Sequence, residues 1–278
     1  MVSFITNDVL SSLQEDLGAQ DFTCDLDVTT HALALKSDAS AKIITRENGV
    51  LCGTEWADEV FRNIGSVAIK WFYQDGDLIE KDSVLCELNG SMSELLVGER
   101  VALNFLQLSS GVATKTRRYV AALANSNIKL LDTRKTIPSL RHLQKKAVVA
   151  GGGDNHRMGL YDAFLIKENH IKACGGIKDA VAKAKSYDKN LLVEVEVESI
   201  AEFKEALAAK ADVALLDNFE IEDIKKVIQL NNSAMKLEVS GNINLFNIRD
   251  YTDLAIDFIS IGDLTKNIEA LDLSMLFC

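Results

Sequence analysis

The 278-residue chain is acidic, with a formal net charge of −11, and its 47% hydrophobic content is ordinary for a globular protein. This charge disfavours a duplex nucleic-acid-binding protein, and no apolar run approaches the length of a membrane span. Five scattered cysteines with no CxxC pair indicate neither a zinc site nor a disulfide framework. We therefore expect a reduced, cytoplasmic protein without a signal peptide.

The first 90 or so residues predict a mixed domain of helices and antiparallel strands. We expect helices up to Leu17 and over 54–61, and strands over 41–45, 67–73 and 84–88. A long helical region follows from Ser91 to about Asn125, and Gly111 is a possible kink within it.

After residue 127 the pattern changes to alternating strands and helices. Strands are expected at 128–131, 146–149, 163–166, 191–197, 213–216, 236–239 and 257–261. Amphipathic helices are expected at 177–186, 199–209, 220–230 and 244–253. Repeated strand–helix units with apolar strands imply a parallel sheet. About seven strands without a dinucleotide fingerprint favour a closed or nearly closed α/β barrel.

A basic block interrupts the acidic chain. From Arg100 to Lys172 there are 13 Lys and Arg residues but only 4 Asp and Glu residues. The block also holds the single proline, Pro138, and a triple glycine at 151–153. Cations gathered around glycine loops are typical of a site that binds a small anion. The alternative, a nucleic-acid patch or a solvated basic face, is disfavoured because the block lacks alternating aromatic residues.

Polar residues follow most of the expected barrel strands at the same place in each unit. The active sites of α/β barrels lie at the carboxyl ends of the strands. The residues at these ends are Asp132, Thr133, Arg134, Lys167, Glu196, Asp217, Ser240, Gly241, Asn242 and Gly262.

Several of these residues also have a purely structural interpretation. Glu194 and Glu196 alternate with valines and face one side of their strand, which indicates either a functional carboxylate or an exposed rim strand. Asp217 could instead cap a helix, and His156 could be a buried core histidine. Arg100 could be a solvated helix residue paired with a glutamate. The histidines show no zinc-ligand spacing.

The sequence resembles the quinolinate phosphoribosyltransferase family, also called nicotinate-nucleotide pyrophosphorylase (carboxylating). The resemblance covers nearly the whole chain. It is carried by ERVALNFLQ, DTRKTIP, GGGDNHRMGLYDAFLIKENHI, EVEVE, LLDNF, EVSGNI and LTKNIEALDLSM.

The resemblance implies an N-terminal α/β sandwich domain over 1–110 and an incomplete, seven-stranded parallel α/β barrel over 111–269. Residues from about 270 to 278 are expected to pack back on the first domain. It also implies a homodimer with shared active sites, no nucleic-acid partner and no membrane. The implied reaction joins quinolinate to phosphoribosyl pyrophosphate with Mg²⁺, and yields nicotinate mononucleotide, pyrophosphate and CO₂ for NAD biosynthesis.

The family motifs assign roles to residues of this chain. They place the quinolinate carboxylates on Arg100, Arg134, His156 and Arg157, with Thr133, Lys135 and Lys167 beside them. They assign Glu196 and Asp217 to the ribose hydroxyls and the metal, largely through substrate and water. The 5′-phosphate is expected on Ser240, Gly241, Asn242, Ile261, Gly262 and Asp263. The residues expected to be catalytic are Lys135, Lys167, Glu196 and Asp217.

Two other functions fit parts of the pattern. One is a molybdenum-transport-associated homologue with a different substrate, which the retained set of Arg134, His156, Arg157 and Lys167 disfavours. The other is a non-catalytic barrel that binds an anion without releasing pyrophosphate.

Overall fold

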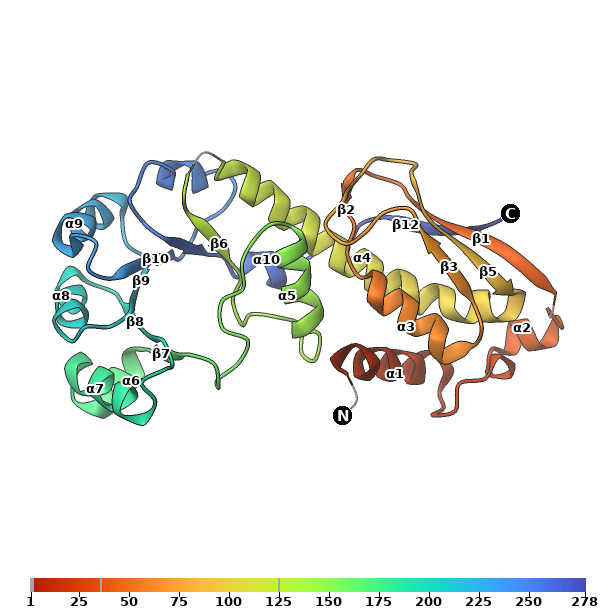
Figure 1. Ribbon diagram of the computed structural model, residues 1–278, viewed down its shortest axis with the longest axis horizontal. Helices are drawn as coiled ribbons and strands as arrows, with labels where there is room; N and C mark the ends of the chain where they lie inside the picture. Colours follow the sequence, from red (N-terminus) through yellow and green to blue (C-terminus); the bar gives the residue numbers. More distant parts are fainter. Residues whose placement is uncertain (1–2, 36, 125) are drawn as a thin grey trace. The chain divides into compact units, whose positions relative to one another are not determined.

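The computed structural model describes residues 3–35, 37–124 and 126–278, and the chain divides into two compact units (Figure 1). The first unit contains the chain up to Arg117, together with Thr136–Gly152 and Leu264–Cys278. The second contains Arg118–Lys135 and Gly153–Asp263. The segment 136–152, which the sequence boundaries assign to the barrel domain, therefore lies in the first unit. No described helix is long and apolar enough to cross a bilayer.

The first unit is built on an antiparallel sheet in the order β12-β1-β5-β3. These strands span Leu273–Phe277, Asp38–Thr45, Val84–Ser91 and Ala68–Trp71, and β2 (Gly49–Val50) pairs separately with β4 (Leu78–Ile79). The helices of this unit include α1 (Phe4–Leu17), α2 (Val28–Ala32), α3 (Thr54–Ile64), most of α4 (Met92–Ala122) and α5 (Arg141–Ala150). The pairing of β12 with β1 brings the end of the chain onto the N-terminal sheet.

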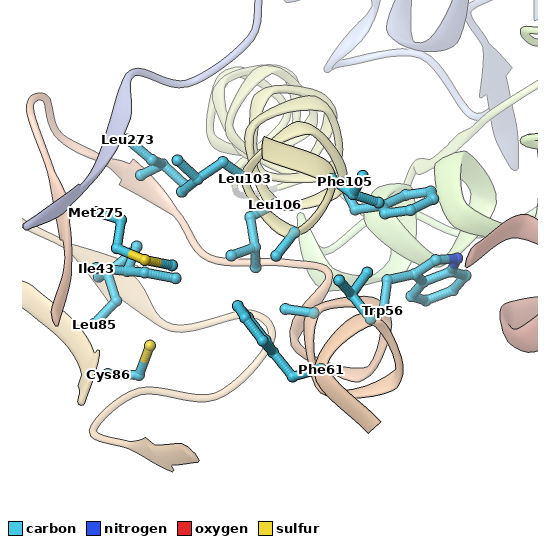
Figure 2. Close-up of a cluster of buried hydrophobic side chains, with 14 of the residues drawn as sticks. Ile43, Trp56, Phe61, Leu85, Cys86, Leu103, Phe105, Leu106, Leu273 and Met275 are labelled. Carbon is cyan, nitrogen blue, oxygen red and sulfur yellow. The ribbon is translucent and has the colours of Figure 1, made fainter. Parts of the chain in front are cut away.

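The core of the first unit lies between this sheet and the helices α3 and α4 (Figure 2). Phe61 on α3 and Leu106 on α4 meet sheet residues such as Ile43, and all three side chains are almost fully buried. α4 runs unbroken from Met92 to Ala122, so the expected kink at Gly111 is absent. A side chain at Gly111 would collide with the backbone carbonyl of Glu269, and the glycine therefore serves close packing.

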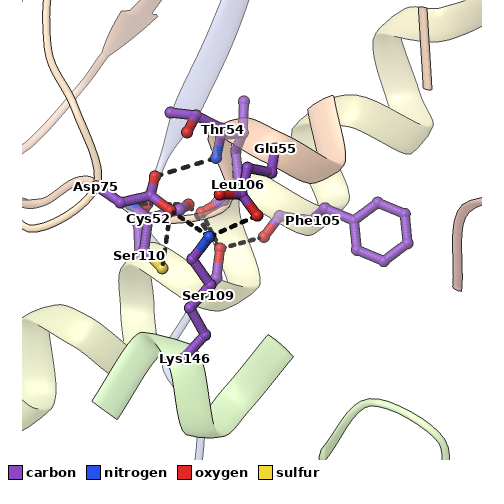
Figure 3. Close-up of polar contacts among 9 residues, drawn as sticks. All are labelled: Cys52, Thr54, Glu55, Asp75, Phe105, Leu106, Ser109, Ser110 and Lys146. Carbon is purple, nitrogen blue, oxygen red and sulfur yellow. Dashed lines mark hydrogen bonds and ion pairs between the residues drawn. The ribbon is translucent and has the colours of Figure 1, made fainter. Parts of the chain in front are cut away.

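A polar cluster joins α5 to the rest of the first unit (Figure 3). The Lys146 ammonium on α5 lies 2.8 Å from Glu55 and 3.5 Å from Asp75. The Asp75 carboxylate also accepts a 3.1 Å hydrogen bond from the Thr54 backbone N–H at the start of α3. Ser109 on α4 donates a 2.6 Å hydrogen bond to the Cys52 carbonyl oxygen. These contacts connect the helices α3, α4 and α5 through the segments that contain Cys52 and Asp75.

The second unit is a six-stranded parallel sheet in the order β6-β11-β10-β9-β8-β7. The strands are β6 (Lys129–Leu131), β7 (Phe164–Ile166), β8 (Val193–Val197), β9 (Val213–Asp217), β10 (Lys236–Ser240) and β11 (Phe258–Ser260). Between successive strands run α6 (Glu168–Cys174), α7 (Ile177–Tyr187), α8 (Ile200–Ala208) and α9 (Ile221–Asn231), on the outer face of the sheet (Figure 1). β6 and β7 form the two edges, so this sheet is a partial barrel.

The predicted strand at 146–149 is wrong: these residues belong to helix α5. A short apolar run cannot be assigned to a strand or a helix by its periodicity alone. The buried positions Leu143, Ala147 and Val148 follow helical spacing, and the helix ends at Gly151. The parallel sheet therefore has six strands rather than about seven in the described part of the chain.

The predicted helix at 244–253 is also wrong, because only a short 3-10 turn forms at Ile248–Tyr251. The Asn244 side chain accepts a hydrogen bond from the Phe246 N–H, and the Asn247 side chain accepts one from the Asn244 N–H. Such side-chain contacts compete with helical hydrogen bonds of the backbone.

The core of the first unit gives a matched stability test. Leu85 on β5 is fully buried, whereas the Leu33 side chain is 63% exposed. We expect Leu85→Ala to lower the free energy of unfolding by about 2–5 kcal/mol, because it leaves a cavity. Leu33→Ala should change it by less than about 0.5 kcal/mol. Chemical denaturation measures both, and equal effects would contradict this account of the core.

Candidate active site

Polar residues gather at the carboxyl ends of the parallel strands in the second unit. Lys167 follows β7, Glu196 lies near the end of β8, and Asp217 and Ser240 are the last residues of β9 and β10. Asp217 and Ser240 are directly paired in the sheet register. The predicted strand-end residues of this unit are therefore brought to one edge.

A hydrogen-bonded network connects the ends of β9 and β10. The Ser240 hydroxyl donates to Asp217 Oδ1 at 2.6 Å, and the Asn218 amide donates to Asp217 Oδ2 at 2.9 Å. The Asn242 amide donates to Asn218 Oδ1 at 3.3 Å. Both carboxylate oxygens of Asp217 are therefore held in place. Asn218 is a site residue that the sequence prediction missed, although it directly follows Asp217 in the LLDNF motif.

Gly241 has to be glycine at this position. Its φ of +96° is left-handed, and a side chain would start 2.2 Å from Asn218 Oδ1 and 2.9 Å from the Asn218 backbone nitrogen. Both the backbone conformation and the available space therefore exclude other residues. The tight turn keeps Asn218 and Asn242 together.

Lys167 and Glu196 form an ion pair between the ends of β7 and β8. The Lys167 side chain is 44% exposed and the Glu196 side chain 16% exposed, so the pair lies at the surface edge rather than in the core. Exposed pairs of this kind add little to stability and can exchange partners for a ligand.

The loop after β6 carries Thr133, Arg134 and Lys135. Arg134 Nε is buried and has no hydrogen-bond partner among the described residues. Beside this loop, Gly262 lies so close to Lys135 that a side chain there would start 2.8 Å from Lys135 Cδ. The buried Ile261 ties its backbone N–H to the Leu131 carbonyl oxygen at 3.0 Å. The ends of β6 and β11 therefore form a second group at the same edge.

Arg157 lies close enough to Arg134 for their charges to interact. Burial lowers the pKa of Arg157, and the charge of Arg134 lowers it further, while Glu194 and Asp162 oppose the shift. Two neighbouring guanidinium groups of like charge can together bind a carboxylate or phosphate.

The segment that carries Arg157 is fixed by carboxylates. The buried Asp132 accepts a 2.9 Å hydrogen bond from the His156 backbone N–H. Asp162 accepts hydrogen bonds from the Met158 and Gly159 N–H groups at 2.6 and 3.1 Å. Burial alone would raise the pKa of Asp162, but these backbone donors lower it below its usual value.

His156 contacts two buried glutamates. Its Nε2 lies 2.9 Å from Glu194 and 3.6 Å from Glu238, and its side chain is 12% exposed. The sequence analysis weighed Glu194 but missed Glu238. The spacing could have indicated Glu238, because it lies two residues before Ser240 on β10 and therefore points to the same side of the sheet. Burial and, after it, the neighbouring Glu194 raise the pKa of Glu238 to about 8, while a charge on His156 opposes the shift.

Two predicted ligand residues lie on helices. Arg100 lies on α4 in the first unit, where its side chain is 59% exposed and 4.0 Å from Glu99. Asp263 begins α10 (Asp263–Lys266), and its charge is one of the causes that raise the pKa of Tyr119, after burial. Their roles as substrate ligands stay predictions.

Family models match nearly the whole chain. The model for the N-terminal domain of quinolinate phosphoribosyl transferase matches residues 27–110, and the model for its C-terminal domain matches residues 112–276. The chain belongs to the quinolinate phosphoribosyltransferase family. The resemblance inferred from the DTRKT and GGGDNHRMGLYD motifs is thereby confirmed.

Individual relatives in this family are similar over their full length. A probable nicotinate-nucleotide pyrophosphorylase (carboxylating) of Bacillus subtilis is 40% identical over 266 residues, covering 94% of this chain and 89% of the relative. The solved structure of the nicotinate-nucleotide pyrophosphorylase from Francisella tularensis is 44% identical, with a TM-score of 0.94 over 100% of this chain and 98% of its own. The corresponding Ehrlichia chaffeensis structure is 37% identical, with a TM-score of 0.92, and covers 100% of this chain and 99% of its own.

The turn at Gly241 yields a prediction with a matched control. Gly175 has a similar φ of +89°, but a side chain there would meet nothing closer than 3.9 Å. We expect both Gly→Ala variants to cost about 1–2 kcal/mol for the left-handed backbone. Gly241→Ala should cost about 1–3 kcal/mol more, because its side chain collides with Asn218. Chemical denaturation measures the difference, and identical losses would show that the Asn218 contact does not constrain the turn.

Proposed function

We propose that this protein is a phosphoribosyltransferase that joins quinolinate to phosphoribosyl pyrophosphate and removes one carboxyl group. The products are nicotinate mononucleotide, pyrophosphate and CO₂, which is a reaction of NAD biosynthesis, and we expect the enzyme to act in the cytoplasm. Membership of the family and the names of its relatives support this assignment. Within the site, the assignment depends on the buried Arg134 Nε, which has no hydrogen-bond partner among the described residues, and on the nearby charge of Arg157.

Quinolinate carries two carboxylates, and the two arginines match that charge. Arg134 has a buried Nε with no partner in the described part of the chain, so a carboxylate oxygen can accept from it. Arg157, on the loop before β7, is close enough for its charge to interact with that of Arg134. Lys135 and Lys167 extend the positive edge toward the pyrophosphate leaving group. Cations there stabilise the negative charge that develops on pyrophosphate.

The carboxylates Glu196 and Asp217 suit the sugar end of the substrate. Breaking the bond from C1 to pyrophosphate builds positive charge on the ribose, which nearby carboxylates stabilise. An all-oxygen pair also fits Mg²⁺, which keeps water and substrate oxygens among its ligands. Neither carboxylate belongs to a three-residue ligand cluster among the described residues, so most of the ligands of Mg²⁺ would come from substrate and water. Bound Mg²⁺ would neutralise charge on the pyrophosphate.

The turns after β10 and β11 suit the 5′-phosphate. Ser240, Gly241 and Asn242 form one turn, and Ile261, Gly262 and Asp263 form the other. Glycines allow backbone N–H groups to approach phosphate oxygens closely. After transfer, the positively charged ring nitrogen takes up the electron pair that the departing CO₂ leaves behind. The decarboxylation therefore requires no strong base, and no residue is assigned as one.

A pyrophosphate-release assay tests the proposed function directly. With phosphoribosyl pyrophosphate and Mg²⁺ present, quinolinate should support turnover with equimolar CO₂, while nicotinate should support little. Equal or faster turnover of nicotinate would contradict the assignment. Binding of quinolinate without any pyrophosphate release would favour the non-catalytic barrel, and no response to quinolinate would favour the molybdenum-associated homologue.

The Asp217 carboxylate gives a test of the sugar end. We expect Asp217→Asn to raise the Mg²⁺ and phosphoribosyl pyrophosphate concentrations needed for half-maximal rate by roughly 10–100-fold. The KM for quinolinate should stay nearly unchanged, because the arginines are intact. Steady-state kinetics with each substrate varied in turn separate the two effects. An equal loss of affinity for both substrates would point instead to a general disturbance of the strand ends.

We further propose that the protein is a homodimer in which Arg100 completes the active site of the partner subunit. Mixing inactive Arg100→Ala and Lys135→Ala subunits should then restore activity, because half of the dimers are hybrids with one intact site each. Recovery should reach roughly a quarter of the wild-type rate with random exchange. If subunit exchange is confirmed by a label and no activity returns, Arg100 does not act across the dimer.

A further inference from the structure

Two buried glutamates that line the same cavity as Arg157 have no role in the proposed reaction. Glu194 and Glu238 are 3% and 1% exposed, and their carboxylate oxygens lie near the same nitrogen of His156. One oxygen of each, Oε1, is buried without a hydrogen-bond partner in the part of the chain that the structure describes. Two adjacent buried carboxylates with too few donors are unfavourable if both are charged.

The hydrogen bonds of His156 determine which of its nitrogens carries a proton. The Arg157 backbone N–H donates to His156 Nδ1 at 2.8 Å, so Nδ1 has to be unprotonated. The ring proton is therefore on Nε2, from which it is donated to Glu194 at 2.9 Å. Imidazole thus supplies one donor to the pair and no formal positive charge.

The same hydrogen bonds argue against a metal ion in this cluster. The nitrogen and carboxylate oxygens lie within 4.8 Å of one another, which is close enough for a shared cation. A metal on Nε2 would require the ring proton to move to Nδ1, where the Arg157 N–H already points. Histidine ligands of metals normally donate from their other nitrogen, and here that nitrogen accepts.

We propose that Glu238 remains a neutral carboxylic acid, so that Glu194 is the only negative charge of the pair near Arg157, and that this proton sets the affinity of the site for its dicarboxylate substrate. The inference rests on the proposed function. With one buried anion the two arginines keep a net positive charge toward the substrate. With both glutamates ionised, that charge would be cancelled and a dianion would be bound weakly.

Other observations support this state of Glu238. Burial and the neighbouring Glu194 raise its pKa to about 8 even when a positive charge on His156 opposes the shift, and a neutral imidazole removes that opposition. The charged groups of the surrounding elements are Lys129, Asp154, Arg157, Asp162, Glu194 and Lys236. Lys129 pairs with Asp154 at 3.2 Å, so that this pair adds little net charge.

The proton on Glu238 has a route to solvent. Glu194 and Glu238 line a cavity of about 530 Å³. The wall of this cavity includes Lys129, Val213 and Phe258, which begin β6, β9 and β11. The cavity therefore connects Glu238 to the amino ends of the strands, and its wall also includes Arg157 of the proposed substrate site.

The test is the pH dependence of the quinolinate KM at saturating phosphoribosyl pyrophosphate. Quinolinate is a dianion throughout pH 7–9, but the fraction of protonated Glu238 falls as the pH rises through its pKa of about 8. If only the protonated form binds well, the KM should rise about tenfold between pH 7 and pH 9. The KM for phosphoribosyl pyrophosphate and the kcat should change much less.

Neutral substitutions should remove this dependence. Glu238→Gln keeps the shape of the side chain and cannot ionise, so its quinolinate KM should vary less than about twofold over the same range. Glu238→Met provides a second neutral variant of similar size if the amide folds poorly. Glu222→Gln, at a largely exposed position of α9, is the matched control and should keep the wild-type profile.

Three outcomes would overturn the inference: a flat wild-type profile, an unchanged profile in both Glu238 variants, or a stoichiometric transition metal in the purified protein that Glu238→Gln removes. Each is distinct from failure of the proposed function, in which quinolinate is not turned over at pH 7 at all.

Discussion

The mutual repulsion of Arg134 and Arg157 is the electrostatic constraint on which the rest of the site depends. Two guanidinium groups of like charge disfavour each other, and the charge of Arg134 adds to burial in lowering the pKa of Arg157. An anion that binds to both groups relieves this repulsion, which favours binding.

The parallel sheet brings the two arginine loops to one edge. All six strands of the second unit point the same way, so their carboxyl ends and the loops that follow lie at one edge. Asp132 and Asp162 fix the loop of Arg157 through backbone N–H groups, and Asp217 is fixed by Ser240 and Asn218. The carboxylates that support the cations therefore use backbone or neutral donors. They leave the arginine side chains available to a ligand.

The strands and the strand-end residues of the second unit could largely be predicted from the sequence. Apolar runs bounded by polar residues are a strong signal for parallel strands, and Lys167, Glu196, Asp217 and Ser240 all lie at the expected ends. The run at 146–149 was misassigned because four apolar residues fit a strand and a helix equally well. The helix is favoured because its buried side chains pack within the first unit against residues distant in the sequence, and the local pattern does not show this packing.

The interior charges were harder to predict. Glu238 lies in the middle of an apolar strand, where one acidic residue suggests an exposed position, and only the structure shows its contact with His156. The state of the histidine likewise depends on one backbone N–H at 2.8 Å from its ring. A sequence pattern indicates which side of a strand a residue faces, but the partner across the barrel and the shared proton follow from three-dimensional packing.

A crystal structure of the protein with quinolinate tests the central claim most directly. The account predicts that the two carboxylates contact the guanidinium groups of Arg134 and Arg157 at the carboxyl ends of the strands, with Arg134 Nε donating to one of them. Quinolinate bound elsewhere, with neither carboxylate in contact with Arg134 or Arg157, would contradict it.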